Sequence, residues 1–206
     1  SFVGFVRGPR RNLSSRFNLR LHFRKKIWYT VNEVRELQFK PFVFENETIP
    51  IPVLIQPMTQ RDAEMTNHPP LWQTSWTSDY LSEPRFEKYA AKIGDELIAF
   101  AAYEILEHSL VVHIAYMEAH PDSNPVLDGG HPKYTGIGRL MIAYGIKLSI
   151  DNGFAGDVIL EAKTTALARH YETDFGAVRL PAFDTSAPRY LIADEVAKRI
   201  FFTYLV

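Results

Sequence analysis

Alternating apolar and polar positions predict strands near the beginning of the chain. Residues 17–23 alternate as in a strand, and the apolar spacing of residues 27–37 suits a short helix. Residues 51–57 again have the pattern of a strand. Thr59 then precedes a short segment of mixed polar and apolar residues, which predicts a helix capped by Thr59. Residues 67–70 end this helix.

Three strand-like runs follow in the middle of the chain. They span residues 86–93, 96–106 and 109–120, and only the short turns Gly94-Asp95 and Glu107-His108 separate them. Such short connections join antiparallel neighbours. The pattern therefore predicts an antiparallel meander.

The last third of the chain alternates between helical and strand patterns. Residues 136–152 are apolar on most sides of a helix, and residues 157–163 contain the continuous apolar run of an interior strand. A strand, a helix and a strand in this order form a right-handed crossover, so the meander's last strand and this one should be parallel. Thr164 caps a second helix that Gly176 ends. Short strands near 177–180 and 189–193 and a terminal helix with Val196, Ile200 and Tyr204 complete the pattern.

Trp72, Trp76 and Tyr80 recur every four residues, which on a helix would make one aromatic stripe. Core packing is the favoured interpretation of this stripe, and a substrate-binding wall is the alternative.

The composition narrows the classes of chemistry. The 206 residues are 46% hydrophobic and 23% charged, as in a globular domain, and no apolar run reaches the ~18 residues of a membrane span. We therefore expect a soluble, cytoplasmic protein with no membrane contact. Cysteine is absent, which excludes disulfides, thiolate nucleophiles and cysteine-based zinc sites.

Charge is distributed unevenly. Residues 1–40 carry ten Lys or Arg and two Glu, a net charge of +8, which leaves −9 for residues 41–206. A solvated extension, a targeting remnant and a contact with nucleic acid or another acidic partner all fit this start.

We expect a basic extension over 1–48, a main domain over 49–193 and a packed terminal helix over 194–206.

The segment from Lys133 to Arg139 is the most informative motif. Gly136 and Gly138, at the start of a helix, let backbone N–H groups approach an anion closely. Met141 stands where a dinucleotide-binding loop needs a third glycine, and no Gly-Lys-Ser/Thr follows, so neither common nucleotide loop fits. A pyrophosphate held by successive amides remains, with Lys133 or Arg139 as its countercharge.

These residues resemble the signature of the GNAT superfamily of acyl-CoA-dependent N-acyltransferases, Gln/Arg-x-x-Gly-x-Gly/Ala, with Lys133 in the first position. The order of elements from about residue 51 to 192 is similar as well, and so is the segment from Ala166 to Glu172. The resemblance implies an α/β fold of mixed α+β type, with a mostly antiparallel twisted sheet, one splayed parallel strand pair and about four helices.

The resemblance also implies acetyl-CoA as co-substrate and a set of residues that bind it. Its pantetheine arm would lie between strands around Met117 and Ile159. The expected contacts are Met117, Ala119, Lys133, Tyr134, Thr135, Gly136, Ile137, Gly138, Arg139, Lys163, Thr164 and Leu167.

Two side chains are candidates for catalysis. An amine with a pKa near ~10.4 needs a base, and a leaving thiolate benefits from a proton donor. Glu118 is the candidate base and Tyr171 the candidate donor, with Tyr116 and His120 in reserve. A buried aromatic role for Tyr171 and a solvated or paired role for Glu118 are the structural alternatives.

The predicted function is direct N-acetyl transfer to an amine on a small molecule, a protein or an aminoacyl-tRNA. The alternative is a non-catalytic acyl-CoA-binding or nucleic-acid-associated module. No metal site is expected, because the histidines lack metal-ligand spacing. A homodimer is one open possibility for the assembly.

Overall fold

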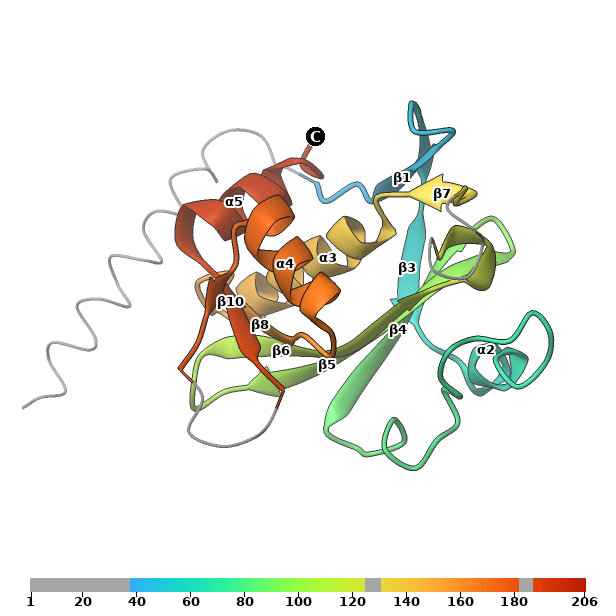
Figure 1. The fold of residues 1–206 in the computed structure, drawn as a ribbon, viewed down its shortest axis with the longest axis horizontal. Coiled ribbons are helices and arrows are strands. Elements are labelled where there is room, and N and C mark those ends of the chain that lie inside the picture. Colours follow the sequence, from blue (N-terminus) through green and yellow to red (C-terminus); the bar gives the residue numbers. More distant parts are fainter. Residues whose placement is uncertain (1–37, 125–130, 182–186) are drawn as a thin grey trace, which may run out of the picture. The chain divides into compact units, whose positions relative to one another are not determined.

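The computed structural model describes residues 38–124, 131–181 and 187–206 (Figure 1). The strand and helix expected within residues 17–37 lie outside this range. The division of the chain into extension, main domain and terminal helix remains a prediction.

A seven-stranded mixed sheet forms the framework of the described residues (Figure 1). Its strand order is β3-β4-β5-β6-β8-β10-β9. The strands are β3 (Leu54–Pro57), β4 (Phe86–Ile93), β5 (Glu96–Leu106), β6 (Val111–Ala119), β8 (Val158–Glu161), β9 (Val178–Arg179) and β10 (Arg189–Ile192). The expected meander is confirmed, since β4, β5 and β6 pair antiparallel in sequence order.

The expected strand over 51–57 is instead two strands in two sheets. Its first part belongs to a three-stranded sheet of order β2-β1-β7, formed by β1 (Phe42–Glu45), β2 (Ile49–Pro52) and β7 (Tyr134–Thr135). Between β2 and β3, Val53 donates its N–H to the carbonyl oxygen of Pro41 at 2.9 Å. The chain leaves one sheet there and enters the other, which an apolar run alone does not reveal.

The parallel pair is confirmed as β6 and β8, which pair from Val112–Val158 to Ile114–Leu160. The register of β6 with β5 shifts directly afterwards, so that Ala102 faces Tyr116 while Tyr103 faces Ile114. Such a bulge bends its strand. Among the described residues, β6 has no further pairs with β8 past the bulge, and the two strands part there.

Capping residues set the helix ends where the sequence predicts them. α2 (Gln60–Met65) begins with a capping box of Thr59 and Asp62, and α4 (Thr165–Phe175) begins with Thr164, whose hydroxyl accepts the N–H of Leu167. Gly176 ends α4 with φ of 66°, in the left-handed region that favours glycine. The other described helices are α3 (Ile137–Asp151) and α5 (Asp194–Phe202), and Tyr204 lies buried just past α5.

The helices divide between the faces of the sheet. α3, α4 and α5 lie on one side of it, which we call the helix face (Figure 1). Tyr103 from β5 shows how this face is packed, since it is fully buried and donates its hydroxyl to the carbonyl of Met141 in α3 at 2.8 Å. No described helix is long and apolar enough to cross a membrane.

The segment after α2 packs on the opposite face without forming a helix. Trp72 and Trp76 are buried there and contact Phe100, with ring centroids 4.9 and 4.8 Å apart. The aromatic stripe was therefore wrong as a helix, because residues 71–82 form turns. Its favoured interpretation as core is right for the two tryptophans, while Tyr80 is 49% exposed.

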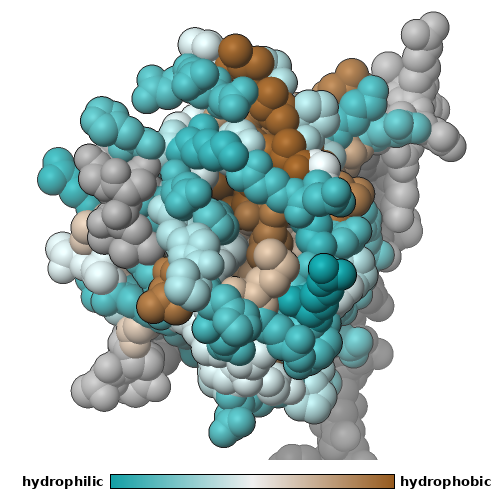
Figure 2. All heavy atoms as spheres, turned by 90° about the vertical axis from the view of Figure 1, so that its right-hand side faces the viewer, coloured by the Kyte–Doolittle hydropathy of each residue, from teal (hydrophilic) through white to brown (hydrophobic). Residues whose placement is uncertain are grey.

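Apolar side chains also gather on the surface that carries β1, β2, β3 and β7. Figure 2 shows a hydrophobic stripe there, bordered by hydrophilic side chains. Ile49 in β2 and Leu54 in β3 are exposed by 51% and 57%.

Candidate functional site

The start of α3 presents a row of backbone donors. Gly136 precedes the helix with φ of 85° and offers no capping side chain, and the first bond within the helix runs from the N–H of Leu140 to the carbonyl of Gly136. No described residue accepts the N–H groups of Ile137, Gly138 and Arg139. A helix N-terminus with such free donors favours an anion. The predicted cradle therefore has the geometry that a phosphate group needs.

The loop before α3 is anchored by hydrogen bonds of the residues that immediately precede Gly136. The N–H of Lys133 donates to the carbonyl of Asp122 at 2.8 Å, and that of Tyr134 donates to the Ser123 hydroxyl at 3.1 Å. The carboxylate of Glu96 accepts hydrogen bonds from the Lys133 ammonium at 2.6 Å and the Tyr134 hydroxyl at 3.1 Å. Thr135 belongs to β7 and pairs with Phe44 of β1.

The two cations expected to balance a pyrophosphate have other partners. Lys133 is paired with Glu96, and this hydrogen bond raises its pKa above the usual value. The Arg139 guanidinium lies over the Phe175 ring, 5.2 Å from its centroid, at the end of α4. The backbone donors are thus the strongest anion-binding element of the described loop.

The edge of β6 past the bulge offers a second set of backbone groups. His120 donates its N–H to the carbonyl of Ile98 in β5 at 2.8 Å, and Glu118 pairs with Phe100 in the same register. Because backbone groups alternate along a strand, those of Met117 and Ala119 point away from β5, toward the gap that β8 leaves. Both residues are thereby available to an extended ligand.

The residues after β8 border this gap. The Lys163 ammonium lies 4.2 Å from the centroid of the Tyr116 ring, so it reaches back toward β6. Thr164 is occupied as the cap of α4, and Leu167 in the first turn of that helix is half-buried.

Tyr171 lies on the helix face, buried between α4 and the sheet. It is 3% exposed, and its ring packs edge-on against Tyr190 of β10 with centroids 5.9 Å apart. No described residue hydrogen-bonds to its hydroxyl. Burial raises the pKa of Tyr171 to about 12, so the phenol is protonated at neutral pH and can donate a proton.

Glu118 lies on the opposite face and is buried rather than solvated. Its carboxylate accepts the backbone N–H of Gln73 and the indole N–H of Trp76, the latter at 3.3 Å. Burial raises the pKa of Glu118, and these hydrogen bonds offset only part of that shift. The side chain therefore anchors the segment after α2, and its role as a base remains a prediction.

The two reserve candidates for catalysis, Tyr116 and His120, lie in β6 and directly after it. The Tyr116 hydroxyl shares a 2.6 Å hydrogen bond with Thr74, and burial raises its pKa. The His120 ring packs against Trp72 and accepts the N–H of Asp122 at 3.2 Å.

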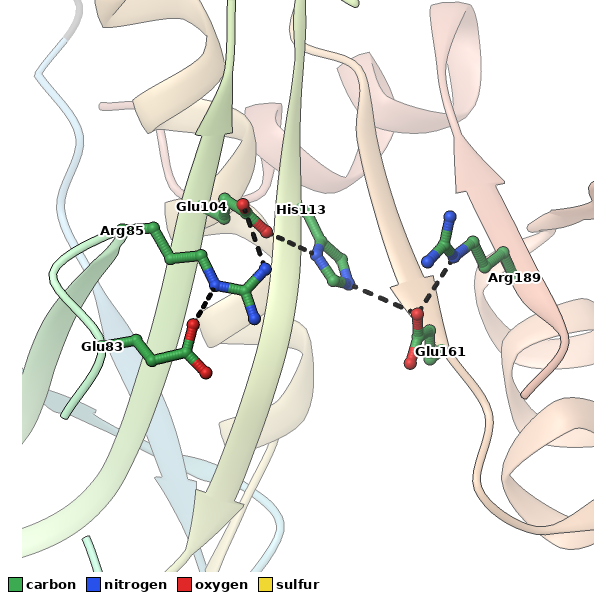
Figure 3. A network of polar contacts seen from close by, with 6 residues as sticks. All are labelled: Glu83, Arg85, Glu104, His113, Glu161 and Arg189. Carbon is green, nitrogen blue, oxygen red and sulfur yellow. Dashed lines mark hydrogen bonds and ion pairs between the residues drawn. The ribbon is translucent and has the colours of Figure 1, made fainter. Parts of the chain in front are cut away.

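Sequence reasoning missed a polar network that crosses the sheet near the parted strands. Figure 3 shows six side chains in a row, from Glu83 to Arg189. The contacts run through Glu83, Arg85, Glu104, His113, Glu161 and Arg189. Glu104 and His113 are register partners on β5 and β6, and Arg189 and Glu161 are partners on β10 and β8. These strand registers bring the four side chains together, although they come from segments far apart in the sequence.

The described residues contain no cluster of three or more side chains suited to a metal ion.

Comparisons with known proteins identify the fold. No protein-family model and no curated protein matches the sequence. A solved structure of a provisionally assigned acetyltransferase is similar at a TM-score of 0.50 and 13% identity, over 73% of this chain and 90% of that one. The chain thus has an acetyltransferase fold, and the expected GNAT-like architecture is confirmed.

Two further structures are similar at lower scores. The paiA N-acetyltransferase from Thermoplasma acidophilum, solved with coenzyme A, has a TM-score of 0.49 and 12% identity, over 69% of this chain and 99% of that one. The ribosomal-protein-S18-alanine N-acetyltransferase from Escherichia coli has a TM-score of 0.47 and 15% identity, over 68% and 90%.

Proposed function

We propose that this protein is an N-acetyltransferase that uses acetyl-CoA and transfers the acetyl group directly to an amine. The observation that carries the proposal is the open first turn of α3, whose three N–H groups have no described acceptor. Few ligands need both a pyrophosphate cradle and an open strand edge, and acetyl-CoA, with its pyrophosphate and its amide-bearing arm, is one of them.

The residues present fit this co-substrate at three places. The N–H groups of Ile137, Gly138 and Arg139 would hold the pyrophosphate. The backbone groups of Met117 and Ala119 would pair with the amides of the pantetheine arm, which would lie between β6 and β8 past the bulge. Lys163, Thr164 and Leu167 would border the arm from the start of α4.

Acetyl-CoA supplies a thioester whose carbonyl carbon an amine can attack. The leaving sulfur has an intrinsic pKa near ~8.5 and gains from a proton donor. Tyr171 suits this role, because it is buried next to the sheet and keeps its proton at neutral pH. A backbone N–H at Met117 or Ala119 would face the developing oxyanion.

The acceptor is an amine of unidentified class. Similar structures include enzymes named for a ribosomal-protein alanine and an aminoglycoside acetyltransferase solved with kanamycin, so the fold serves very different amines. The proposal accordingly fixes the donor and leaves the acceptor to experiment.

The test is transfer of labelled acetyl from acetyl-CoA into a panel of amines and into a lysate separated into small molecules, protein and RNA. Label in one fraction, dependent on Tyr171, supports the proposal. Binding of acetyl-CoA without transfer to any fraction would instead indicate a non-catalytic acyl-CoA-binding module.

A further inference from the structure

His113 lies at the centre of the polar network of Figure 3 with one nitrogen unsatisfied. Its Nδ1 is 3.3 Å from Glu104 Oε2, and its Nε2 is 3.9 Å from Glu161 Oε1. The Nε2 atom is buried and has no hydrogen-bond partner. If Nδ1–H donates to Glu104, Nε2 carries a lone pair that points toward a carboxylate. A proton taken up at Nε2 would give an imidazolium between the carboxylates of Glu104 and Glu161, whose negative charges stabilise it.

The network also lies where the strands part. His113 and Ile159 are partners in the parallel ladder, and Glu161 directly follows the last paired residue, Leu160. Side chains alternate along each strand, so Ile114 and Leu160 point to the helix face while His113 and Glu161 point to the other. Tyr171 packs on the helix face against Tyr190. At the gap, the candidate proton donor Tyr171 thus lies on the helix face of the sheet, and the His113 and Glu161 side chains lie on the opposite face.

Other polar groups on the face of His113 are already engaged. Both oxygens of Glu118 accept N–H groups, and the Tyr116 hydroxyl is bonded to Thr74. Glu161 differs, because its side chain is 27% exposed and only its Oε1 atom has described partners, Arg189 at 3.0 Å and His113. Its second oxygen is left to receive a ligand that donates a proton.

We propose that Glu161 binds the acceptor's ammonium group and that His113, oriented by Glu104, stores the proton that this group must lose. The proposal rests on the acetyltransferase function above and adds the amine side of the reaction. Glu161 touches the substrate. His113 and Glu104 act through Glu161 and are positioning residues.

The reaction begins at the acceptor's ammonium group. The ammonium loses a proton through Glu161 to His113 Nε2, and the free amine attacks the thioester carbonyl carbon. The C–N bond forms, the C–S bond breaks, and the sulfur takes a proton from Tyr171. The nitrogen's second proton restores Tyr171, and His113 releases its own to solvent, so that one proton is lost per turnover.

The groups around His113 that also carry charge or titrate come from several elements. They are Glu104 from β5, Glu161 from β8, Arg189 from β10, Glu83 and Arg85 before β4, and Tyr80, whose hydroxyl interacts electrostatically with several of these side chains.

The experiment compares kcat/KM for an amine found by the acetyl-transfer screen in the wild type, His113→Gln and Glu161→Gln between pH 6 and 10. Both variants should lose about 100-fold at pH 7, the usual size of general-base catalysis. The deficit should shrink as the pH approaches the amine's pKa of ~10.4, because the free amine needs no proton acceptor. Acetyl-CoA affinity should stay within about twofold, since that site lies elsewhere.

Glu83→Gln is the matched control, because it changes the far end of the same network and leaves the contacts of His113 intact. It should keep the wild-type profile. If His113→Gln folds poorly, Glu161→Gln, at a partly exposed position, supplies the same comparison.

If His113→Gln and Glu161→Gln keep kcat/KM within threefold of the wild type, with a parallel pH profile, the proposed proton transfer through Glu161 to His113 is wrong. The acetyltransferase proposal would then be unaffected. An equal loss at every pH together with weaker acetyl-CoA binding would also overturn this proton transfer, as a structural effect. Failure of the wild type to bind acetyl-CoA would instead refute the proposed function itself.

Discussion

Gly138→Glu should make the protein more stable and at the same time weaken its binding of acetyl-CoA. Gly138 is the second residue of α3, and a Cβ built there meets no atom within 4 Å. Glutamate in the first turn of a helix is favoured over glycine by about 0.5–1 kcal/mol, because it has the higher helix propensity and its charge suits the helix N-terminus. For a chain of this size the melting temperature should rise by about 1–4 °C.

The same carboxylate would repel the anion and compete for the N–H groups that bind it. The N–H groups of Ile137, Gly138 and Arg139 have no described acceptor, and a hydrogen bond to a charged group contributes about 1.5–3 kcal/mol. Loss of one such bond weakens binding by about 10- to 150-fold. Calorimetric titration with acetyl-CoA, beside a thermal melt without it, measures both effects.

Gly145→Ala is the control within the same helix. A Cβ there would lie 3.1 Å from Tyr103 Cε1 and 3.2 Å from Ile114 Cδ1, in a closely packed contact between α3 and the sheet. It should destabilise the protein by about 1–3 kcal/mol and leave acetyl-CoA affinity unchanged. Wild-type affinity in Gly138→Glu, or an equal loss of affinity in both variants, would refute the assignment of the start of α3 as the pyrophosphate site.

Three further changes test other parts of the structure. Tyr171→Phe should lower kcat at least tenfold with unchanged acetyl-CoA affinity, and a fully active variant would remove Tyr171 from the mechanism. Burial raises the pKa of Asp62, but its hydrogen bonds with Lys92 and Thr59 lower it overall, below 3.8. Asp62→Asn should therefore cost about 1–3 kcal/mol at pH 7, and in urea unfolding this difference should shrink as the pH falls through that lowered pKa. The pKa of Glu118 is raised by burial, so the folded state binds this proton more tightly than the unfolded chain. The wild type should accordingly gain stability relative to Glu118→Gln as the pH is lowered from 7 toward 4.5, and a constant difference would contradict the burial argument.

Local signals in the sequence predicted much of the fold. Thr59, Thr164 and Gly176 mark helix ends through their own side chains or backbone freedom, and short turns define the meander. These features depend on residues a few positions apart. The parallel pair of β6 and β8 was also predicted correctly, because a strand, a helix and a strand in that order form a crossover between parallel strands.

The segment from Trp72 to Tyr80 was misjudged because its spacing of four arises without a helix. Its tryptophans are buried one by one against Phe100, and Glu118, 42 residues beyond Trp76, accepts the indole N–H. Such long-range partners are invisible in a local pattern.

The network around His113 escaped prediction for a related reason. Its members come from four strands and a loop, and the bulge in β6 shifts which residues face each other. A single-residue change in register would place His113 on the helix face. The residues alone therefore suggest no link between Glu104, His113 and Glu161.

Calorimetric titration of the wild-type chain with acetyl-CoA is the decisive measurement for a pyrophosphate site at α3. We expect saturable binding of one acetyl-CoA per chain, which inorganic pyrophosphate weakens by competing for the first turn of α3. No binding at millimolar acetyl-CoA, or binding that pyrophosphate leaves unchanged, would contradict it.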